Sequence, residues 1–373
     1  MTETSTDLFS PLDLGRYRLA NRVTMAALTR QRAGTSGVPT DLHAEYYFQR
    51  ASAGLVVTEG TFPSVTTRAF PGQAGIETDE QAAGWRRVAE RVHEGGGVLF
   101  MQIMHGGRVS HPNLLEGQQP EAPSALEWGG QVHTFDGKQD APVPRALEAE
   151  EMPRIVEQFR AAARRAVDAG LDGVEIHGAN GYLLHEFLSP VSNTRDDDYG
   201  GSPRNRYRLV EEVVRAVAAD IGADRTALRL SPEHNIQGVI EEDRADTLAT
   251  FGGLLDALSD LNLAYVSLLH KDAASDDADS LPAELARRAR ANGATRVIAN
   301  TGFGHVTDLD EANALMALPH VDAVAVGRQL IANPDLVLRW REGLELNTPD
   351  AATFYAPGAE GYTDYPFAGA PDA

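Results

Sequence analysis

The chain has 373 residues, a formal net charge of −21 and no cysteine. This length suffices for a large core in one or two domains, and the lack of thiols excludes disulfides, cysteine nucleophiles and cysteine-bound zinc or iron–sulfur clusters. The negative charge argues against nucleic acid and anionic membranes as partners, because their phosphates would be repelled. No apolar run is long enough to span a bilayer and the N-terminus has no signal-peptide pattern, so we expect a soluble, cytoplasmic protein.

The basic residues are almost all arginines, and only Lys138 and Lys271 are lysines. Salt adaptation and a GC-rich genome both explain an acidic, lysine-poor chain, and we prefer the second explanation. In either case an anionic cofactor must bind local arginines or helix N-termini against the field of the whole protein.

The first part of the chain predicts an N-terminal hairpin followed by three buried strands with helices between them. The hairpin spans residues 7–21 around a glycine turn. Strands are expected at 22–28, 55–60 and 98–104, and helices at 41–53 and 80–94. The second helix ends at three glycines, residues 95–97, which is a strong helix stop.

Residues 106–149 interrupt this alternation. They are rich in Pro and Gly and show little periodicity, and a hairpin is expected at 132–138. An insertion this long in a compact domain is usually functional or mobile.

The alternation then resumes and continues to the C-terminal region. Strands are expected at 173–177, 226–230, 264–268, 296–300 and 323–326, and helices at 151–169, 204–219, 244–260, 282–292, 308–317 and 329–342. Eight short apolar strands, each followed by a helical segment, predict a parallel α/β fold of the (β/α)₈ TIM-barrel class with one long insertion after the third strand. The alternative, a doubly wound open sheet, would need a GxGxxG fingerprint after the first strand, and the residues there are ALTRQRAG.

Polar side chains follow the predicted strands where a barrel enzyme places its site, at their carboxyl ends. Buried strands otherwise exclude Gln, Arg and His, so several polar ends together indicate function. They are Thr29 and Arg30, Glu59 to Thr61, Gln102 to Arg108, His177, Arg229 to Pro232, Asn300 to Phe303, and Gly327 with Arg328.

The most informative corner follows the fourth strand, where His177, Asn180 and Tyr182 lie at spacings of three and two between glycines. Each residue alone is compatible with an ordinary β–α turn. The three together favour an active site.

This corner, HGANGYLLHEFLSPVSNTRDDDYGGS, resembles the Old Yellow Enzyme family of FMN-dependent ene-reductases. The resemblance extends over nearly the whole chain, through NRVTMAALTR, HGGRVSHP, RLSP, GRQLIANPDLV and AEGYTDYP. It implies a single barrel domain over residues 1–373, with noncovalent FMN on the barrel top and NADH or NADPH as reductant. Residues 343–373 would close near the site.

The resemblance also assigns roles. FMN would contact Ala27, Leu28, Thr29, Gly60, Gln102, His177, Arg229, Asn300, Gly302, Phe303, Gly327 and Arg328. An α,β-unsaturated carbonyl or nitro compound would place its oxygen between His177 and Asn180, and Tyr182 would protonate the α-carbon. Phe70, Met104 and Tyr355 would line the substrate pocket. Ala27, Met104 and Phe70 stand where many members have Pro, Trp and Tyr, respectively. Because Met is narrower and more adaptable than Trp, the pocket is expected to be wider.

The sequence is also compatible with two other functions. A metal-dependent barrel hydrolase would use His43, His105 and His177, but the first strand carries no HxH pair. A Schiff-base aldolase would use Lys271, which follows the sixth strand in a polar run. Neither the preference for NADH or NADPH nor the choice between monomer and homodimer follows from the sequence.

Overall fold

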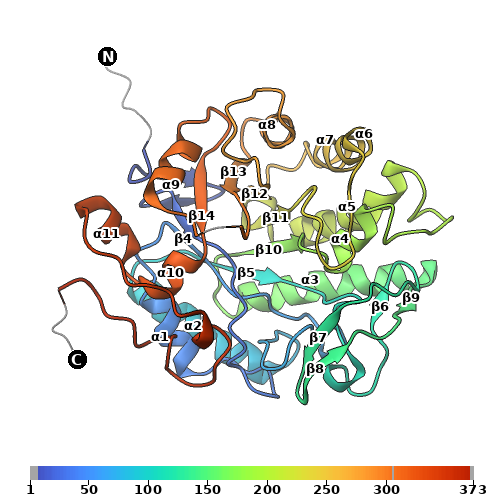
Figure 1. The fold of residues 1–373 in the computed structure, drawn as a ribbon, viewed down its shortest axis with the longest axis horizontal. Helices are drawn as coiled ribbons and strands as arrows, with labels where there is room; N and C mark the ends of the chain where they lie inside the picture. The colour runs from blue at the N-terminus through green and yellow to red at the C-terminus, as the bar shows by residue number, and fades with distance from the viewer. Residues whose placement is uncertain (1–6, 305, 370–373) are drawn as a thin grey trace.

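The computed structural model describes residues 7–304 and 306–369. Its centre is a closed barrel of eight parallel strands in the order β10-β11-β12-β13-β14-β3-β4-β5, which Figure 1 shows surrounded by helices. The strands are β3 (Val23–Met25), β4 (Leu55–Val57), β5 (Leu99–Ile103), β10 (Gly173–Gly178), β11 (Thr226–Leu230), β12 (Tyr265–Leu269), β13 (Arg296–Asn300) and β14 (Ala323–Val326). The predicted fold class is confirmed, and each predicted strand is present.

The helices cover the barrel because their apolar faces pack on the outward side chains of the strands. They are α1 (Asp41–Phe48), α2 (Asp79–Glu94), α3 (Met152–Asp168), α4 (Leu183–Leu188), α5 (Pro203–Ile221), α6 (Arg244–Thr247), α7 (Gly253–Ala257), α8 (Leu281–Ala289), α9 (Leu309–Met316), α10 (Arg328–Ala332) and α11 (Leu336–Glu342). Within the described residues, no helix has the length and hydropathy needed to cross a bilayer.

Two segments predicted as single helices are interrupted. Residues 329–342 form α10 and α11 because Pro334 has no N–H to donate and disfavours helical geometry at Asn333. Residues 244–260 form α6, a π-helical turn (Leu248–Gly252) and α7. Gly252 and Gly253 lie in this region, where a β-carbon would crowd Arg288 and Tyr207 of the neighbouring helices.

The N-terminal hairpin, β1 (Leu12–Leu14) and β2 (Tyr17–Leu19), closes the bottom of the barrel. Its turn residue Gly15 has φ +55°, and a β-carbon there would lie 2.1 Å from the Asp224 carbonyl oxygen, just before β11. The Tyr17 hydroxyl donates to the Asp172 carbonyl, just before β10, at 2.7 Å. The hairpin therefore covers the amino ends of the strands, which leaves their carboxyl ends for the site.

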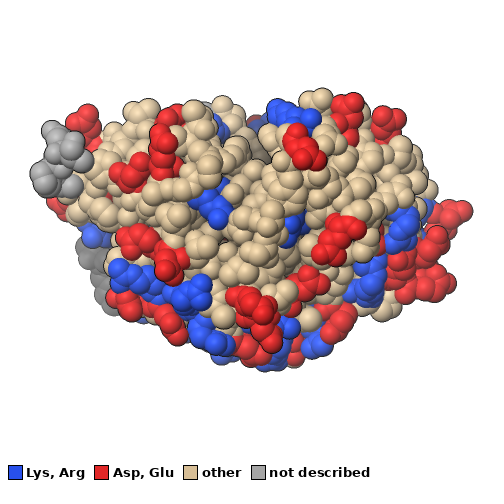
Figure 2. Space-filling model, turned by 90° about the horizontal axis from the view of Figure 1, so that it is seen from below, with Lys and Arg blue, Asp and Glu red and all other residues tan. Residues whose placement is uncertain are grey.

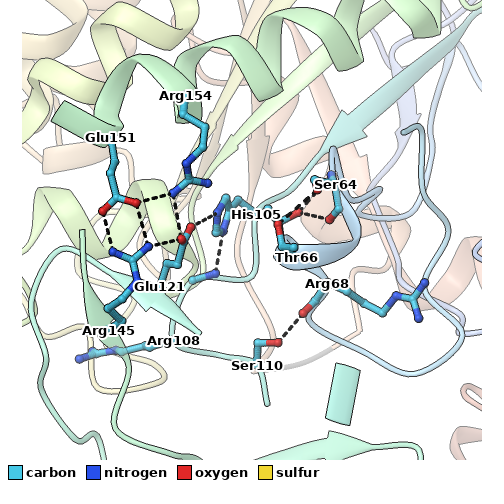
Figure 3. Close-up of polar contacts among 12 residues, drawn as sticks. Ser64, Thr66, Arg68, His105, Arg108, Ser110, Glu121, Arg145, Glu151 and Arg154 are labelled. Atoms are coloured by element: carbon cyan, nitrogen blue, oxygen red, sulfur yellow. Dashed lines mark hydrogen bonds and ion pairs between the residues drawn. The ribbon is translucent and has the colours of Figure 1, made fainter. Parts of the chain in front are cut away.

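The insertion between β5 and α3 contains the predicted hairpin, β7 (Gln131–Thr134) and β8 (Gly137–Asp140), and a short parallel pair, β6 (Glu121–Ala122) and β9 (Arg145–Ala146). Figure 3 shows the Glu121 carboxylate between His105 at the end of β5 and two arginines. Glu121 contacts Arg145, lies 2.8 Å from Arg154 Nη2 and 3.8 Å from His105 Nε2, and the two arginines also pair with Glu151. This network fastens the base of the insertion to the barrel beside the site.

The surface shows how the acidic chain arranges its charges. On the face drawn in Figure 2, basic and acidic side chains intermingle, and no large basic patch is visible. Arginines on the helices are commonly paired, as Arg160 is with Glu157 and Asp220, and Arg215 with Glu211. Solvent screens such exposed pairs, so they shape the surface more than they stabilise the fold.

Candidate active site

The carboxyl ends of the strands surround a cavity of about 470 Å³. A smaller hollow of about 50 Å³ adjoins it at the ends of β13 and β14. The cavity is lined by Ala27, Leu28, Thr29, Arg30, Gln31, Phe70, Gln102, Met104, His177, Asn180, Tyr182, Ile236, Gln237, Phe303, Arg328, Ile331, Phe354 and Tyr355. The hollow adds Ala26, Arg229, Asn300, Gly302, Val306, Thr307 and Gly327.

Every residue predicted for the site lies in or against these two spaces. Gly60 lies in neither lining, but a β-carbon there would lie 2.8 Å from Met104 Sδ and 3.4 Å from Gln102 Oε1. Its hydrogen side chain therefore leaves room for both side chains that face the cavity.

The corner after β10 is fixed by neighbours on two sides. Asn180 and Gly181 have φ +58° and +81°, a left-handed conformation that Asn and Gly tolerate best. The Asn180 N–H donates to Ser231 Oγ at 2.8 Å, and the Gly181 N–H donates to His185 Nδ1 at 3.0 Å. A β-carbon at Gly181 would lie 2.8 Å from Gln237 Cβ, so the corner and the loop after β11 pack tightly together.

His177 and Tyr182 face the cavity from this corner with rings 5.3 Å apart. Burial, Arg229 and His185 lower the pKa of His177 well below its usual value, so the imidazole is neutral at pH 7. Burial raises the pKa of Tyr182, although its hydrogen bond with Gln237 opposes that rise, so the phenol keeps its proton. One neutral donor and one protonated acid therefore face the same space.

Several buried polar atoms here have no partner among the described residues. They include His177 Nδ1, Asn180 Oδ1 and Arg229 Nε. Buried polar groups are ordinarily paired, so these atoms fit a polar ligand that supplies the missing hydrogen bonds. A flat ring with a hydrogen-bonding edge, such as a flavin, satisfies these requirements.

The hollow between β13 and β14 suits a phosphate. Gly302 has φ +99°, and its N–H donates to Asn300 Oδ1 at 2.9 Å. A β-carbon on Gly327 would meet only Leu28, at 3.6 Å, which leaves the backbone at the start of α10 accessible. Arg328 Nη2 donates to the Phe303 carbonyl at 2.5 Å, which places a guanidinium at the same rim. Many barrels bind phosphate after the seventh and eighth strands.

Two buried arginines hold the C-terminal segment beside the cavity. Arg32 donates to four backbone carbonyls between residues 353 and 360. Arg30 donates to the carbonyls of Phe354 and Gly361 at 2.9 and 2.7 Å. Phe354 and Tyr355 thereby become walls of the cavity.

Several lining residues were not predicted from the sequence, among them Ile236, Gln237, Ile331 and Phe354. Gln237 donates to the Asn180 carbonyl at 2.6 Å and has φ +56°. It lies in a loop without periodicity, so no sequence signal separated it from its neighbours.

Apart from His177, the residues of the two alternative functions lie outside the lining of this cavity. His43 lies against Glu59 in the core, and His105 lies against Glu121. Lys271 is exposed in the turn after β12. Among residues 7–304 and 306–369, no three His, Asp or Glu side chains are grouped to hold a metal ion.

Comparison with known proteins agrees with this geometry. The model of the NADH:flavin oxidoreductase / NADH oxidase family matches residues 7–347. A probable flavin mononucleotide-dependent alkene reductase of Leishmania infantum is 40% identical, over 96% of this chain and 97% of the relative. Among solved structures, morphinone reductase is 42% identical with a TM-score of 0.89, covering 98% of both chains; it has also been solved with tetrahydroNAD.

An Old Yellow Enzyme homologue from Zymomonas mobilis is 39% identical, covers 96% of this chain and 99% of its own, and superposes with a TM-score of 0.88. Identity at this level over nearly the whole chain, together with the family match, goes beyond a shared barrel fold. The chain therefore belongs to the NADH:flavin oxidoreductase / NADH oxidase family, the family of Old Yellow Enzyme that its corner after β10 resembles.

Proposed function

We propose that this protein is an FMN-dependent ene-reductase that reduces activated C=C bonds of α,β-unsaturated carbonyl or nitro compounds, with NADH or NADPH as reductant. One observation carries the proposal. His177, Asn180 and Tyr182 converge on one cavity, and the buried Nδ1 of His177 has no partner among the described residues. The whole chain then acts as one flavin domain, with the segments at 106–149 and 343–369 flanking the site.

FMN, when bound, supplies the hydride that adds to the β-carbon of the substrate. Gln102 and Arg229 would hold the flavin ring, Thr29 its edge, and the glycines at 302 and 327 with Arg328 its phosphate. The family comparison supports this cofactor, because the relatives include a protein named for FMN.

His177 and Asn180 donate hydrogen bonds to the carbonyl or nitro oxygen of the substrate. Negative charge grows on this oxygen as the β-carbon is reduced, and donors fixed in advance stabilise that charge more than they stabilise the bound substrate. The neutral state of His177 suits this role, since it donates an N–H without losing a proton to the product.

Tyr182 then transfers its phenolic proton to the α-carbon, and the phenolate is reprotonated from water. General acids of this kind contribute about 10²–10⁴ in rate. Phe70, Met104 and Tyr355 line the space around the reacting carbons. Met104 adapts its shape more readily than an aromatic ring, which favours a broad range of substrates.

The double variant His177→Ala/Asn180→Ala tests the oxygen-binding role. We expect p-hydroxybenzaldehyde, a phenol that presents an oxyanion, to bind far more weakly, and enone reduction to slow by about 10²–10³ for each donor lost. Arg18→Met, on the exposed hairpin at the opposite end of the barrel, is the control and should retain both. Unchanged phenol binding and enone turnover in the double variant would refute the assignment.

A further inference from the structure

A carboxylate lies inside the barrel, where the proposed mechanism gives it no role. Glu175 is in the middle of β10, two residues before His177, and its side chain is 2% exposed. Strand pairing places it beside Gln102 of β5 and Ala227 of β11. Burying an ionised carboxylate costs several kcal/mol unless partners compensate, so its partners explain why it is there.

Glu175 accepts two hydrogen bonds, one on each oxygen. Gln102 Nε2 donates to Oε1 at 2.7 Å, and the Tyr265 hydroxyl donates to Oε2 at 3.0 Å. Tyr265 is fully buried and its pKa is raised well above the usual value, so it keeps its proton and acts as the donor. Burial raises the pKa of Glu175, while the charge of Arg229 and both hydrogen bonds act in the opposite direction and favour the carboxylate.

The carboxylate fixes which end of the Gln102 amide faces the cavity. An ionised carboxylate only accepts hydrogen bonds, so the Gln102 NH₂ group must point toward Glu175. The amide oxygen is then the atom that Gln102 presents to the cavity it lines. Were Glu175 neutral, it could donate to that oxygen, and the amide would turn its NH₂ group to the cavity.

This orientation matters for a flavin, whose pyrimidine edge alternates an acceptor oxygen, the N3–H donor and a second acceptor oxygen. An amide oxygen can pair only with the N3–H. An amide NH₂ group can pair only with the carbonyl oxygens. The ionisation state of Glu175 therefore decides which atom of the flavin pyrimidine edge Gln102 can bind.

We propose that Glu175 is a positioning residue for the cofactor: it holds the Gln102 amide so that its oxygen would meet the flavin N3–H, and it partly offsets the charge of the neighbouring Arg229. The inference rests on the proposed flavin site. Because Arg229 favours the reduced, anionic flavin and Glu175 opposes it, Glu175 also keeps the reduction potential of the bound flavin low enough for it to pass hydride on to an alkene.

Three variants of the holoenzyme test the proposal. Glu175→Gln preserves volume but removes the charge and the fixed acceptor. The affinity for FMN should fall by about tenfold, and the flavin midpoint potential should rise. Glu175→Asp keeps the charge but withdraws it from Gln102, so affinity should fall without a rise in potential. Tyr265→Phe removes only the other donor and should leave both quantities near wild type.

Affinity is measured by diluting the holoenzyme and following the fluorescence of released FMN, and the potential by anaerobic dye titration. Wild-type affinity and potential in Glu175→Gln would overturn the proposal, as would equal losses in all three variants, which would indicate general damage to the barrel. If Glu175→Gln does not fold, wild-type affinity in Glu175→Asp would overturn it alone. Wild-type protein that binds no FMN would instead contradict the proposed function.

Discussion

Replacing Tyr182 by phenylalanine separates proton delivery from every other step of the proposed reaction. The ring that packs edge-on against Phe70, with centroids 6.3 Å apart, and near His177 is retained. Only the hydroxyl and its hydrogen bond with Gln237 are lost. A hydrogen bond of this kind contributes about 0.5–1.5 kcal/mol to stability, so the variant should fold and bind FMN.

The expected chemical effect is larger than this structural cost. Loss of a general acid lowers a rate by about 10²–10⁴, which corresponds to about 2.7–5.4 kcal/mol in the activation free energy. Burial raises the pKa of Tyr182, so the phenol of the wild type is protonated throughout the neutral pH range and able to donate its proton.

Anaerobic stopped-flow measurements resolve the two half-reactions. Flavin reduction by the nicotinamide nucleotide should stay near wild type in Tyr182→Phe, whereas reoxidation by 2-cyclohexenone should slow by the factor given above. Reoxidation by a nitroalkene should slow less, because hydride addition gives a stable nitronate that can leave and be protonated in water. Equal losses with both substrates, or no loss with either, would show that another group or water is the acid.

Two further predictions concern the segments that flank the site. Arg32→Met removes the donor from four carbonyls of the C-terminal segment, so hydrogen exchange at 353–360 should accelerate and KM for the enone should rise more than kcat falls. Arg18→Met, on the exposed hairpin, is the control. Unchanged exchange in Arg32→Met would contradict the prediction. Although burial acts to raise it, the proximity of His105 and the charge of Arg154 lower the pKa of Glu121 to about 2. This depressed pKa stabilises the base of the insertion at pH above the ordinary carboxyl value of about 4.3, and the stabilisation is lost as the pH falls toward 2. In the wild type, cleavage of the insertion by pepsin should therefore speed up as the pH falls through this range. In Glu121→Gln, cleavage should already be fast at the upper end of the range and should change less with pH. Identical pH profiles for the two proteins would refute the role of Glu121.

The parts of the fold with strong periodic signals were predictable from the sequence. The strand positions, the hairpin at residues 7–21, the insertion and the family are confirmed, because short apolar runs between helical segments leave few arrangements other than a barrel. The flavin oxidoreductase reaction class follows from the same family membership. The helix boundaries at Pro334 and around Gly252 were wrong where a local breaker or close packing overrode the helical period.

The site was predictable only where polar residues interrupt apolar strands or adjoin glycines. His177, Asn180 and Tyr182 gave such a signal, and the structure places them together, although their roles stay predictions. Gln237 gave none, because it reaches the cavity through the fold of a long loop. Glu175 gave none either: its partner Gln102 is 73 residues away in the sequence, and only barrel closure brings β5 beside β10.

Anaerobic titration of the purified protein, followed by its visible spectrum, tests the proposed function as a whole. We predict a yellow protein whose bound flavin is released by heat as FMN and not FAD, because the phosphate hollow at Gly302 and Gly327 accompanies no dinucleotide fingerprint. Addition of NADH or NADPH should bleach the flavin bands, and subsequent 2-cyclohexenone should restore them with formation of cyclohexanone. A colourless protein, bound FAD, or a reduced flavin that the enone does not reoxidise would contradict the proposal.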